Sequence, residues 1–256
     1  MKISIVIPAY NEEHRLGPTL TAYLSYFTPL YGADYEIVVV VNGSRDGTER
    51  VARSFEPGHP QVQVLVEPRA VGKGGAVMLG FAAARGELIG FTDADGSTPP
   101  DAFDDLARNI GSAGAIIGSR WLPESQVSPP QPLKRRLVSR IFNFLVRRFF
   151  KVNLRDTQCG AKVMTRQAIR DVLPAIGITR WAFDVDLLFK LRRAGYRITE
   201  RATTWHDVTG SQLRIGRASF EMFVAIVRLR LIYSPFRGIV TAYDATLGRW
   251  LHRVGT

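Results

Sequence analysis

Short apolar runs alternate with longer polar or amphipathic stretches along the first half of the chain. Five runs are almost wholly apolar and end in turn residues: Ile3–Ile7, Ile37–Val41, Val62–Val66, Leu88–Phe91 and Ala115–Gly118. Runs of this kind predict strands that are buried on both faces of a sheet. Because the stretches between the first runs are long enough for helices, the pattern predicts an α/β domain with a mostly parallel sheet and right-handed crossovers.

Polar and glycine-rich segments follow the ends of the first four predicted strands. They are Tyr10–Glu13, Asn42–Thr48, Glu67–Gly75 and Asp93–Gly96. The carboxyl ends of parallel strands lie at one edge of a sheet, and ligands bind outside that edge. We therefore expect a ligand site there, built from four loops.

The segment Asp93-Ala94-Asp95-Gly96 is the most informative of the four. Two carboxylates one residue apart form a fork that can hold a divalent cation, and the cation can hold a diphosphate. The same residue types are also typical of an ordinary turn that caps the next helix. The residues alone leave both interpretations open.

The segment Gly72-Lys73-Gly74-Gly75 also has the chemistry of a phosphate site. Its glycines permit close backbone approach, the following helix N-terminus attracts phosphate, and Lys73 adds a positive charge. The spacing of a Walker A loop is absent. A simple turn at the start of a helix is the alternative.

The overall charge narrows the classes of partner. Among 256 residues, 34 Lys and Arg stand against 23 Asp and Glu, a formal charge of +11. This excess fits an anionic membrane surface or a phosphorylated substrate. Nucleic acid is the least favoured partner, because no recognised binding motif accompanies the charge. The single cysteine, Cys159, excludes an intramolecular disulfide and is compatible with the cytosol.

Residues 136 to 151 predict an amphipathic helix, and no apolar run reaches the roughly 18 to 20 residues of a spanning helix. On a helical wheel Arg136, Arg140, Asn143, Arg147 and Lys151 form a polar stripe, opposite Val138, Ile141, Phe142, Leu145, Val146 and Phe149. Such a helix fits a bilayer interface. Packing of the apolar side on the sheet is the commoner outcome for amphipathic helices, and both stay open. We expect a chain that is soluble or attached to one membrane face.

Several motifs, taken in order, resemble family 2 inverting glycosyltransferases. They are Val6–Glu13, Gly43–Thr48, Gly72–Ala76 and Asp93–Gly96. Three further segments look like the branch that glycosylates polyprenyl phosphates, and within it like dolichyl-phosphate β-glucosyltransferases: Gly118–Arg120, Asp156–Gly160 and Arg180–Leu188. The resemblance extends over about residues 3 to 205.

The resemblance implies a GT-A fold, which is a Rossmann-like α/β fold with a mostly parallel sheet. It also implies transfer of a hexose, expected to be glucose, from a nucleotide diphosphate sugar to a polyprenyl phosphate of the dolichyl or undecaprenyl type, with Mg²⁺ or Mn²⁺ as cofactor. We expect UDP-glucose as donor and keep GDP-mannose as the alternative, because Asn42 stands where related enzymes have an aspartate. The protein would be cytoplasmic and peripheral on the cytosolic membrane face.

The resemblance also assigns site residues. The expected donor-binding residues are Pro8, Ala9, Tyr10, Glu12, Asn42, Lys73, Asp93, Ala94 and Asp95. Asp95 is the first choice as metal ligand and Asp93 the second. Asp184 is the expected catalytic carboxylate, as a general base for a hydroxyl acceptor or as an orienting group for a phosphate acceptor. The expected acceptor-phosphate residues are Arg120, Arg135 and Ser139.

The implied organisation is a catalytic domain over residues 1–210 and a helical extension over residues 211–256. The catalytic domain includes residues 120–151 as an acceptor loop and interfacial helix, and the Pro-rich part of that loop is typical of a lid or a disordered connector. Two other functions stay open. One keeps the fold and donor but uses a soluble or polysaccharide hydroxyl acceptor. The other is an inactive nucleotide-sugar-binding membrane scaffold.

Overall fold

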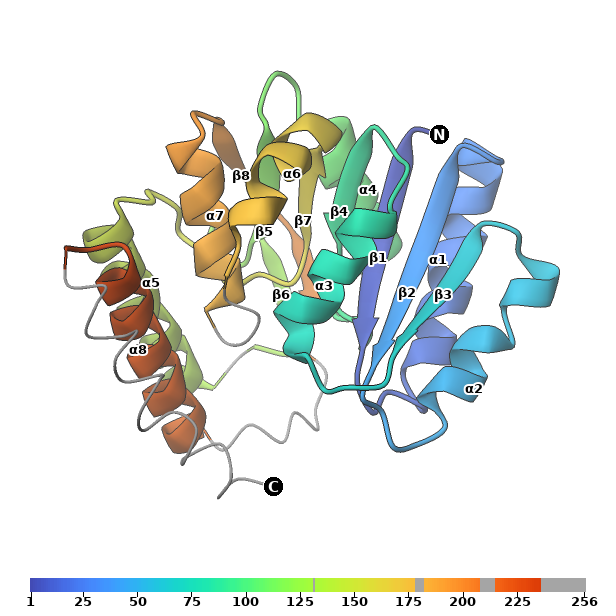
Figure 1. Cartoon of the computed structure of the whole chain (residues 1–256), viewed down its shortest axis with the longest axis horizontal. Coiled ribbons are helices and arrows are strands. Elements are labelled where there is room, and N and C mark those ends of the chain that lie inside the picture. Colours follow the sequence, from blue (N-terminus) through green and yellow to red (C-terminus); the bar gives the residue numbers. More distant parts are fainter. Residues whose placement is uncertain (131, 178–181, 208–214, 236–256) are drawn as a thin grey trace.

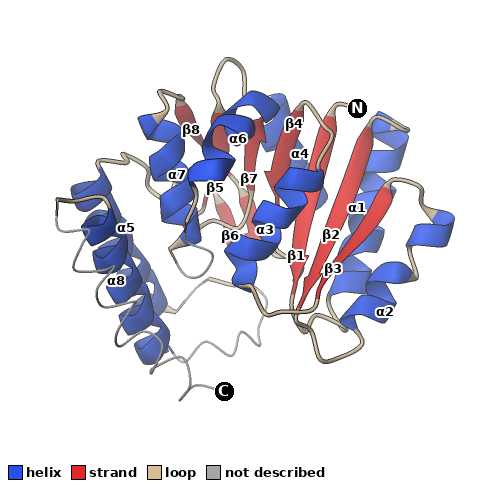
Figure 2. Ribbon diagram, in the orientation of Figure 1, coloured by secondary structure: helices blue, strands red, loops and turns tan. Residues whose placement is uncertain are grey.

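Seven strands build the central sheet of the structure, which is a computed structural model (Figures 1 and 2). It describes the chain except residues 131, 178–181, 208–214 and 236–256, and it leaves the side chains of 134, 135 and 215–222 undescribed. In spatial order the strands are β3 (Val62–Glu67), β2 (Tyr35–Asn42), β1 (Ile3–Ala9), β4 (Leu88–Phe91), β7 (Lys162–Thr165), β5 (Ala115–Ser119) and β8 (Ile198–Ala202). The predicted α/β class with a mostly parallel sheet is therefore confirmed.

Strand β7 interrupts the parallel order, because it runs antiparallel to both β4 and β5. The five strands predicted from apolar runs are confirmed, and each observed strand contains its predicted run. Strand β7 was missed because its four residues begin with Lys162 and end with Thr165, so it contains no comparable apolar run. This strand carries a buried lysine into the site described below.

Helices cover both faces of the sheet (Figure 2). One face is packed by α1 (Leu16–Tyr31), α2 (Thr48–Arg53) and α4 (Pro100–Arg108), with the short turn η1 (Glu56–Gly58) beside them. The other face is packed by α3 (Gly72–Ala83), α6 (Arg166–Val172) and α7 (Phe183–Arg193), with the turn η2 (Leu173–Ala175) after α6. Strands β1 and β2 are buried along their whole length, as their apolar sequences require.

Two further helices, α5 (Leu133–Phe150) and α8 (Ile215–Ile232), lie side by side at one end of the molecule (Figure 1). They share a hydrophobic cluster with α7, built from Phe142, Val146, Phe150, Val185, Leu188, Ile226 and Leu229. None of the described helices combines the length and the apolar content needed to cross a bilayer.

The wheel predicted for α5 is wrong in part. Asn143 was placed on the polar stripe, but its side chain is buried, and its Oδ1 accepts hydrogen bonds from the backbone N–H and the hydroxyl of Thr157 at 3.0 and 2.7 Å. Ile141 was placed on the apolar side and is 52% exposed. Periodicity cannot show that a polar residue finds a buried partner elsewhere in the chain, so the buried face is rotated from the expected one.

A two-stranded sheet of β6 (Gln126–Ser128) and β9 (Thr204–His206) fixes part of the expected lid. The loop after β5 therefore contains regular structure that its sequence did not predict. The backbone N–H of His206 also donates to the carbonyl of Ser97 at 2.8 Å, just after the acidic fork. This contact brings β9 against the carboxyl end of β4.

Tyr233 ties the C-terminal helix to α7. Its hydroxyl, just beyond α8, donates to Oδ1 of the buried Asp186 at 2.6 Å. Burial, and then Asp186, raise the pKa of Tyr233, so the phenol stays a donor. Tyr233→Phe should lower the free energy of unfolding by about 1.5–3 kcal/mol, the range for a hydrogen bond to a charged group.

Urea denaturation measures this loss. Tyr196→Phe is the matched control, because Tyr196 donates to the exposed Asp171 in the same way and should cost less. A loss for Tyr233→Phe no larger than for the control would contradict the prediction.

Candidate active site

The acidic fork follows β4, and the structure brings Lys73 onto it. Lys73 lies in the first turn of α3, and its Nζ is 2.5 Å from Oδ1 of Asp93. Asp95 Oδ1 accepts a hydrogen bond from the backbone N–H of Ser97 at 3.0 Å. Gly96 between them has φ +73°, a conformation that favours glycine. The turn at Asp95–Ser97 and a cation-binding fork are therefore compatible, because the turn holds the two carboxylates in place.

The loops after β1 and β2 are joined by hydrogen bonds beside the fork. The Nδ2 of Asn42, a buried residue, donates to the carbonyl of Ala9 at 3.3 Å, and the backbone N–H of Glu12 donates to the hydroxyl of Thr48 at 2.7 Å. Pro8, the residue before Ala9, is buried at the end of β1. Tyr10 projects to the surface with 52% exposure. The strand ends are thus fixed relative to each other.

Glu12 interacts electrostatically with the fork, and Ala94 joins the fork to α1. Burial raises the pKa of Glu12, Arg15 opposes this, and the charges of Asp95 and Asp93 raise it further. The carbonyl of Ala94 accepts a hydrogen bond from the buried hydroxyl of Thr19 at 2.9 Å. Glu12 therefore lies within the negative field of the fork.

Asp184 lies in the first turn of α7 and is paired with a buried lysine. Its Oδ1 is 2.6 Å from Nζ of Lys162, which is fully buried and also donates to the carbonyl of Cys159 at 2.6 Å. The Lys162 ammonium lies 5.3 Å from the ring centroid of Phe91, and the Lys73 ammonium lies 5.5 Å from the same centroid. Phe91 thus contacts both cations at the end of β4.

The two lysines balance three carboxylates. Burial acts against the charge of Lys73, but Asp93, Asp184 and Asp95 together raise the pKa of Lys73 above its ordinary value. Since the side chain is still 39% exposed, a ligand can reach it. A positive group accessible to ligand thus stands among the acidic residues of the site.

Arg120 follows β5 and is held by a buried aspartate. Its Nε and Nη2 donate to the two carboxylate oxygens of Asp156 at 2.7 and 2.9 Å, and its guanidinium carbon lies 4.9 Å from the ring centroid of Trp205. Burial acts against ionisation of Asp156, but Arg120 outweighs it and lowers the pKa of Asp156. A guanidinium has five N–H donors, so Arg120 can still donate to a ligand while Asp156 fixes its plane.

Gly160 separates the fork from Arg120's surroundings. A Cβ at this position would lie 2.1 Å from Oδ2 of Asp93 and 3.2 Å from Cη2 of Trp205. Only glycine therefore lets these two side chains approach the same point. The sequence singles out the motif Asp156–Gly160, but it does not indicate the contacts that Asp156, Gly160, Lys162 and Trp205 make.

Two of the expected acceptor residues are not joined to Arg120 by the described contacts. The side chain of Arg135 lies outside the described part of the structure, and Ser139 is half-buried on the first half of α5. Arg140, the next residue, places its guanidinium carbon 5.6 Å from the ring centroid of Trp121. Helix α5 is therefore linked to the residue that follows Arg120, and the roles of Arg135 and Ser139 stay predictions.

The fork has the donor atoms that a hard divalent cation prefers. Within the described residues, no three His, Cys, Asp or Glu side chains gather as a metal-binding group. The carboxylates of Asp93 and Asp95 supply fewer ligands than Mg²⁺ or Mn²⁺ requires, and phosphate oxygens commonly complete such shells. The residues fit a cation that is shared with a diphosphate.

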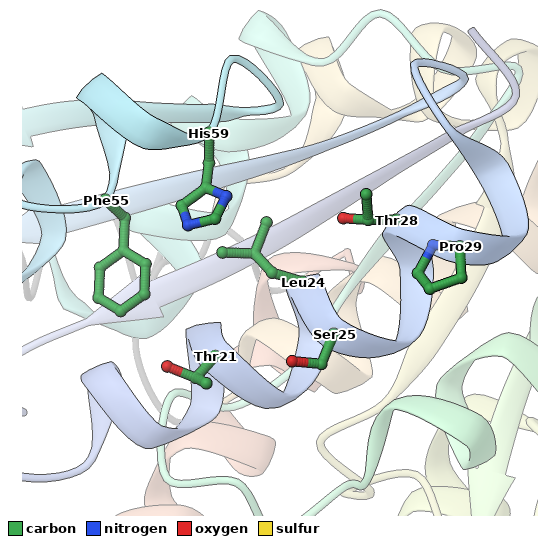
Figure 3. A pocket seen from close by; sticks show the side chains of 7 residues that line it. All are labelled: Thr21, Leu24, Ser25, Thr28, Pro29, Phe55 and His59. Carbon is green, nitrogen blue, oxygen red and sulfur yellow. The ribbon is translucent and has the colours of Figure 1, made fainter.

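A separate hollow of about 320 Å³ lies on the α1 face of the sheet (Figure 3). It is lined by Thr21, Leu24, Ser25, Thr28, Pro29, Phe55 and His59. No carboxylate lines it, and none of the expected site residues belongs to it. This hollow therefore adds nothing to the site at the strand ends.

The fold of the chain is the GT-A fold, as two solved structures show. A glucosyl-3-phosphoglycerate synthase from Mycobacterium tuberculosis, solved with Mn²⁺ and UDP, matches over 90% of this chain and 79% of its own chain. The TM-score is 0.66 and the sequence identity is 19%. The mannosyltransferase PcManGT from Pyrobaculum calidifontis, solved with GDP-Man and Mn²⁺, has TM-score 0.65 and 20% identity over 97% of this chain and 71% of its own.

The family follows from the sequence match. Residues 4–173 match Glycosyl transferase family 2, and the chain belongs to this family. A dolichyl-phosphate beta-glucosyltransferase from Drosophila melanogaster is 36% identical over 88% of this chain and 75% of its own length. A dolichyl-phosphate beta-glucosyltransferase from Homo sapiens is 34% identical over 91% of this chain and 76% of its own length. The family resemblance seen in the motifs is thus confirmed.

The Lys162–Asp184 pair should be essential to stability. Lys162→Met leaves Asp184 buried without its cation, and breaking a buried pair in this way costs about 3–5 kcal/mol of unfolding free energy. Adding Asp184→Asn should recover part of the loss, because the remaining side chain is then neutral. Chemical denaturation of both single variants and the double variant forms the cycle. Strictly additive losses would contradict the pairing.

Proposed function

We propose that the protein transfers glucose, with inversion, from UDP-glucose to a polyprenyl phosphate at the cytosolic face of a membrane; GDP-mannose is the alternative donor. One observation carries this proposal. Across Gly160, the acidic fork stands next to Trp205, and Trp205 in turn holds the guanidinium of Arg120. A site for a cation with a diphosphate thus adjoins a site for a second phosphate.

The donor diphosphate would lie between the fork and Lys73. A divalent cation held by Asp95 and Asp93 would supply charge neutralisation for the departing nucleoside diphosphate. The Lys73 ammonium, held beside Asp93, would donate to a phosphate oxygen of the same group. Pro8, Ala9, Tyr10, Glu12 and Asn42 are assigned to the nucleotide and Ala94 to the donor backbone contact, as the family motifs imply.

The acceptor phosphate would be held by the free donors of Arg120, with Arg135 and Ser139 from α5. A phosphate monoester is largely dianionic near neutral pH, because its second pKa is about 6. Its oxygen attacks the anomeric carbon, the bond from that carbon to the donor phosphate oxygen breaks, and the nucleoside diphosphate leaves. No proton has to be removed. Asp184, already paired with Lys162, would therefore orient the sugar or acceptor.

The exposed side of α5 and α8 supports a membrane-facing surface. Six side chains form an apolar surface, with exposures between 45% and 79%: Leu133, Leu137, Ile141, Phe144, Phe223 and Val224. Exposed cations lie on α5 and at its C-terminal cap: Arg136, Arg140, Arg147, Arg148 and Lys151. Apolar side chains flanked by Arg and Lys suit the boundary between acyl chains and anionic head groups. We assign residues 1–210 to the catalytic domain and 211–256 to an extension that contributes to this surface.

Transfer to the lipid is tested by screening UDP- and GDP-sugars with Mn²⁺ against a polyprenyl phosphate and measuring the mass of the lipid product. Asp95→Asn should lower kcat by about 10²- to 10³-fold, the range for losing one stabiliser of transition-state charge. Asp34→Asn, at the opposite edge of the sheet, is the matched control and should leave kcat unchanged. Transfer only to a hydroxyl acceptor would refute the lipid assignment, and full activity of Asp95→Asn would refute the fork assignment.

Membrane attachment is tested by sedimentation with anionic liposomes. The wild-type protein should sediment, and a Leu137→Glu, Phe144→Glu double variant should bind at least about tenfold more weakly, because it loses apolar burial and gains negative charge. Leu30→Glu is the control, since Leu30 is 52% exposed on α1, away from this surface. Equal binding of the double variant and the control would rule out this surface.

A further inference from the structure

Trp205 lies between the two halves of the proposed site. It belongs to β9 and is 5% exposed. The guanidinium carbon of Arg120 lies 4.9 Å from the ring centroid of Trp205. The Cη2 of Trp205 lies beside Gly160, which Asp93 also contacts. The indole therefore touches the surroundings of both the acceptor cation and the acidic fork.

The indole N–H of Trp205 has no hydrogen-bond partner within the described part of the chain, although it is buried. A buried donor without a partner is costly, and native structures rarely leave one. Other residues near Trp205 also have buried polar atoms of this kind. The neighbours of Arg120 and Asp156 in the sequence contribute three more buried polar atoms without described partners: Oγ of Ser119, Nε1 of Trp121 and Nε2 of Gln158.

These four groups share one chemical property, which is that each can donate a hydrogen bond. Two indole N–H groups and one amide NH₂ are donors only, and the hydroxyl can donate as well as accept. The carboxylate of Asp156, the acidic group beside Arg120, is already bound to Arg120 through both oxygens. An excess of donors around a guanidinium fits an anionic ligand that is rich in acceptor oxygens.

The covalent geometry of indole fixes where the N–H lies. Nε1 is on the same long edge of the ring as Cη2, three bonds away. Since Cη2 lies beside Gly160, which the Asp93 carboxylate also contacts, one end of that edge is on the fork side of the region between the fork and Arg120. Asp93 Oδ1 is held by Lys73, so the fork side of this space is already partly neutralised. A phosphate oxygen is the acceptor that this position suits.

We propose that Trp205 is a substrate-binding residue whose indole N–H donates to a phosphate oxygen bound between the acidic fork and Arg120, while its ring face holds the guanidinium. This inference rests on the proposed function. The phosphate has two sources, the acceptor monoester and the donor diphosphate, and the experiment separates them.

The experiment removes the N–H in two ways. Trp205→Phe keeps an aromatic face for Arg120, and replacement of Trp205 by 3-benzothienylalanine keeps the full shape of the indole but has sulfur in place of the N–H. Both proteins are titrated calorimetrically with farnesyl phosphate and, separately, with UDP in the presence of Mn²⁺, and thermal unfolding is recorded. Tyr35→Phe is the control, because it removes a buried hydroxyl, which shares a hydrogen bond with the Thr28 hydroxyl, outside the site.

Loss of a hydrogen bond to a charged oxygen should weaken binding by about tenfold or more in both variants, with little change in melting temperature for the benzothienyl protein. Weaker binding of farnesyl phosphate alone assigns the N–H to the acceptor, and weaker binding of UDP alone assigns it to the donor. Unchanged affinity for both ligands in the folded benzothienyl protein would overturn the proposal. Failure of the wild-type protein to bind farnesyl phosphate, with the UDP result intact, would instead refute the lipid acceptor.

Discussion

Pairing of buried charges is the constraint on which the carboxyl edge of this sheet depends. Three of the carboxylates at this edge each have a cation of their own: Asp93 with Lys73, Asp184 with Lys162, and Asp156 with Arg120. An unpaired carboxylate in such a place would cost several kcal/mol or would take up a proton. Because every pair joins residues that are distant in the sequence, the site forms only when the whole sheet is assembled.

The antiparallel strand β7 makes this pairing possible. It enters between β4 and β5, directly after Cys159, Gly160 and Ala161. Lys162 is thereby placed at the ring of Phe91, the last residue of β4, and Gly160 comes to rest against Asp93. An all-parallel sheet would have put β5 beside β4 and left no room for either contact. The single reversal in the sheet is therefore what joins the fork to Asp184 and Arg120.

The strands and the acidic fork could be predicted from the sequence because their signals are local. Apolar runs mark buried strands, and Asp93 and Asp95 are separated by one residue at the end of such a run. Burial of Lys162 could not be predicted, since a lysine at the start of a short strand normally indicates the surface. Its burial depends on Asp184, which lies in another element. Asn143 misled the helical wheel for the same reason, because its buried partner, Thr157, lies outside its helix.

The position of Trp205 was the hardest to predict from the sequence, since it follows from a two-stranded sheet that no sequence pattern indicated. Strand β6 supplies the partner for β9, and the contact from His206 to Ser97 sets β9 beside the fork. Arg120 is then enclosed by Asp156 through two hydrogen bonds and by Trp205 through its ring face. A guanidinium fixed in this way loses little conformational entropy when it binds an anion. In the proposed function, this prior ordering of Arg120, more than its charge alone, would suit this edge of the sheet to a second phosphate.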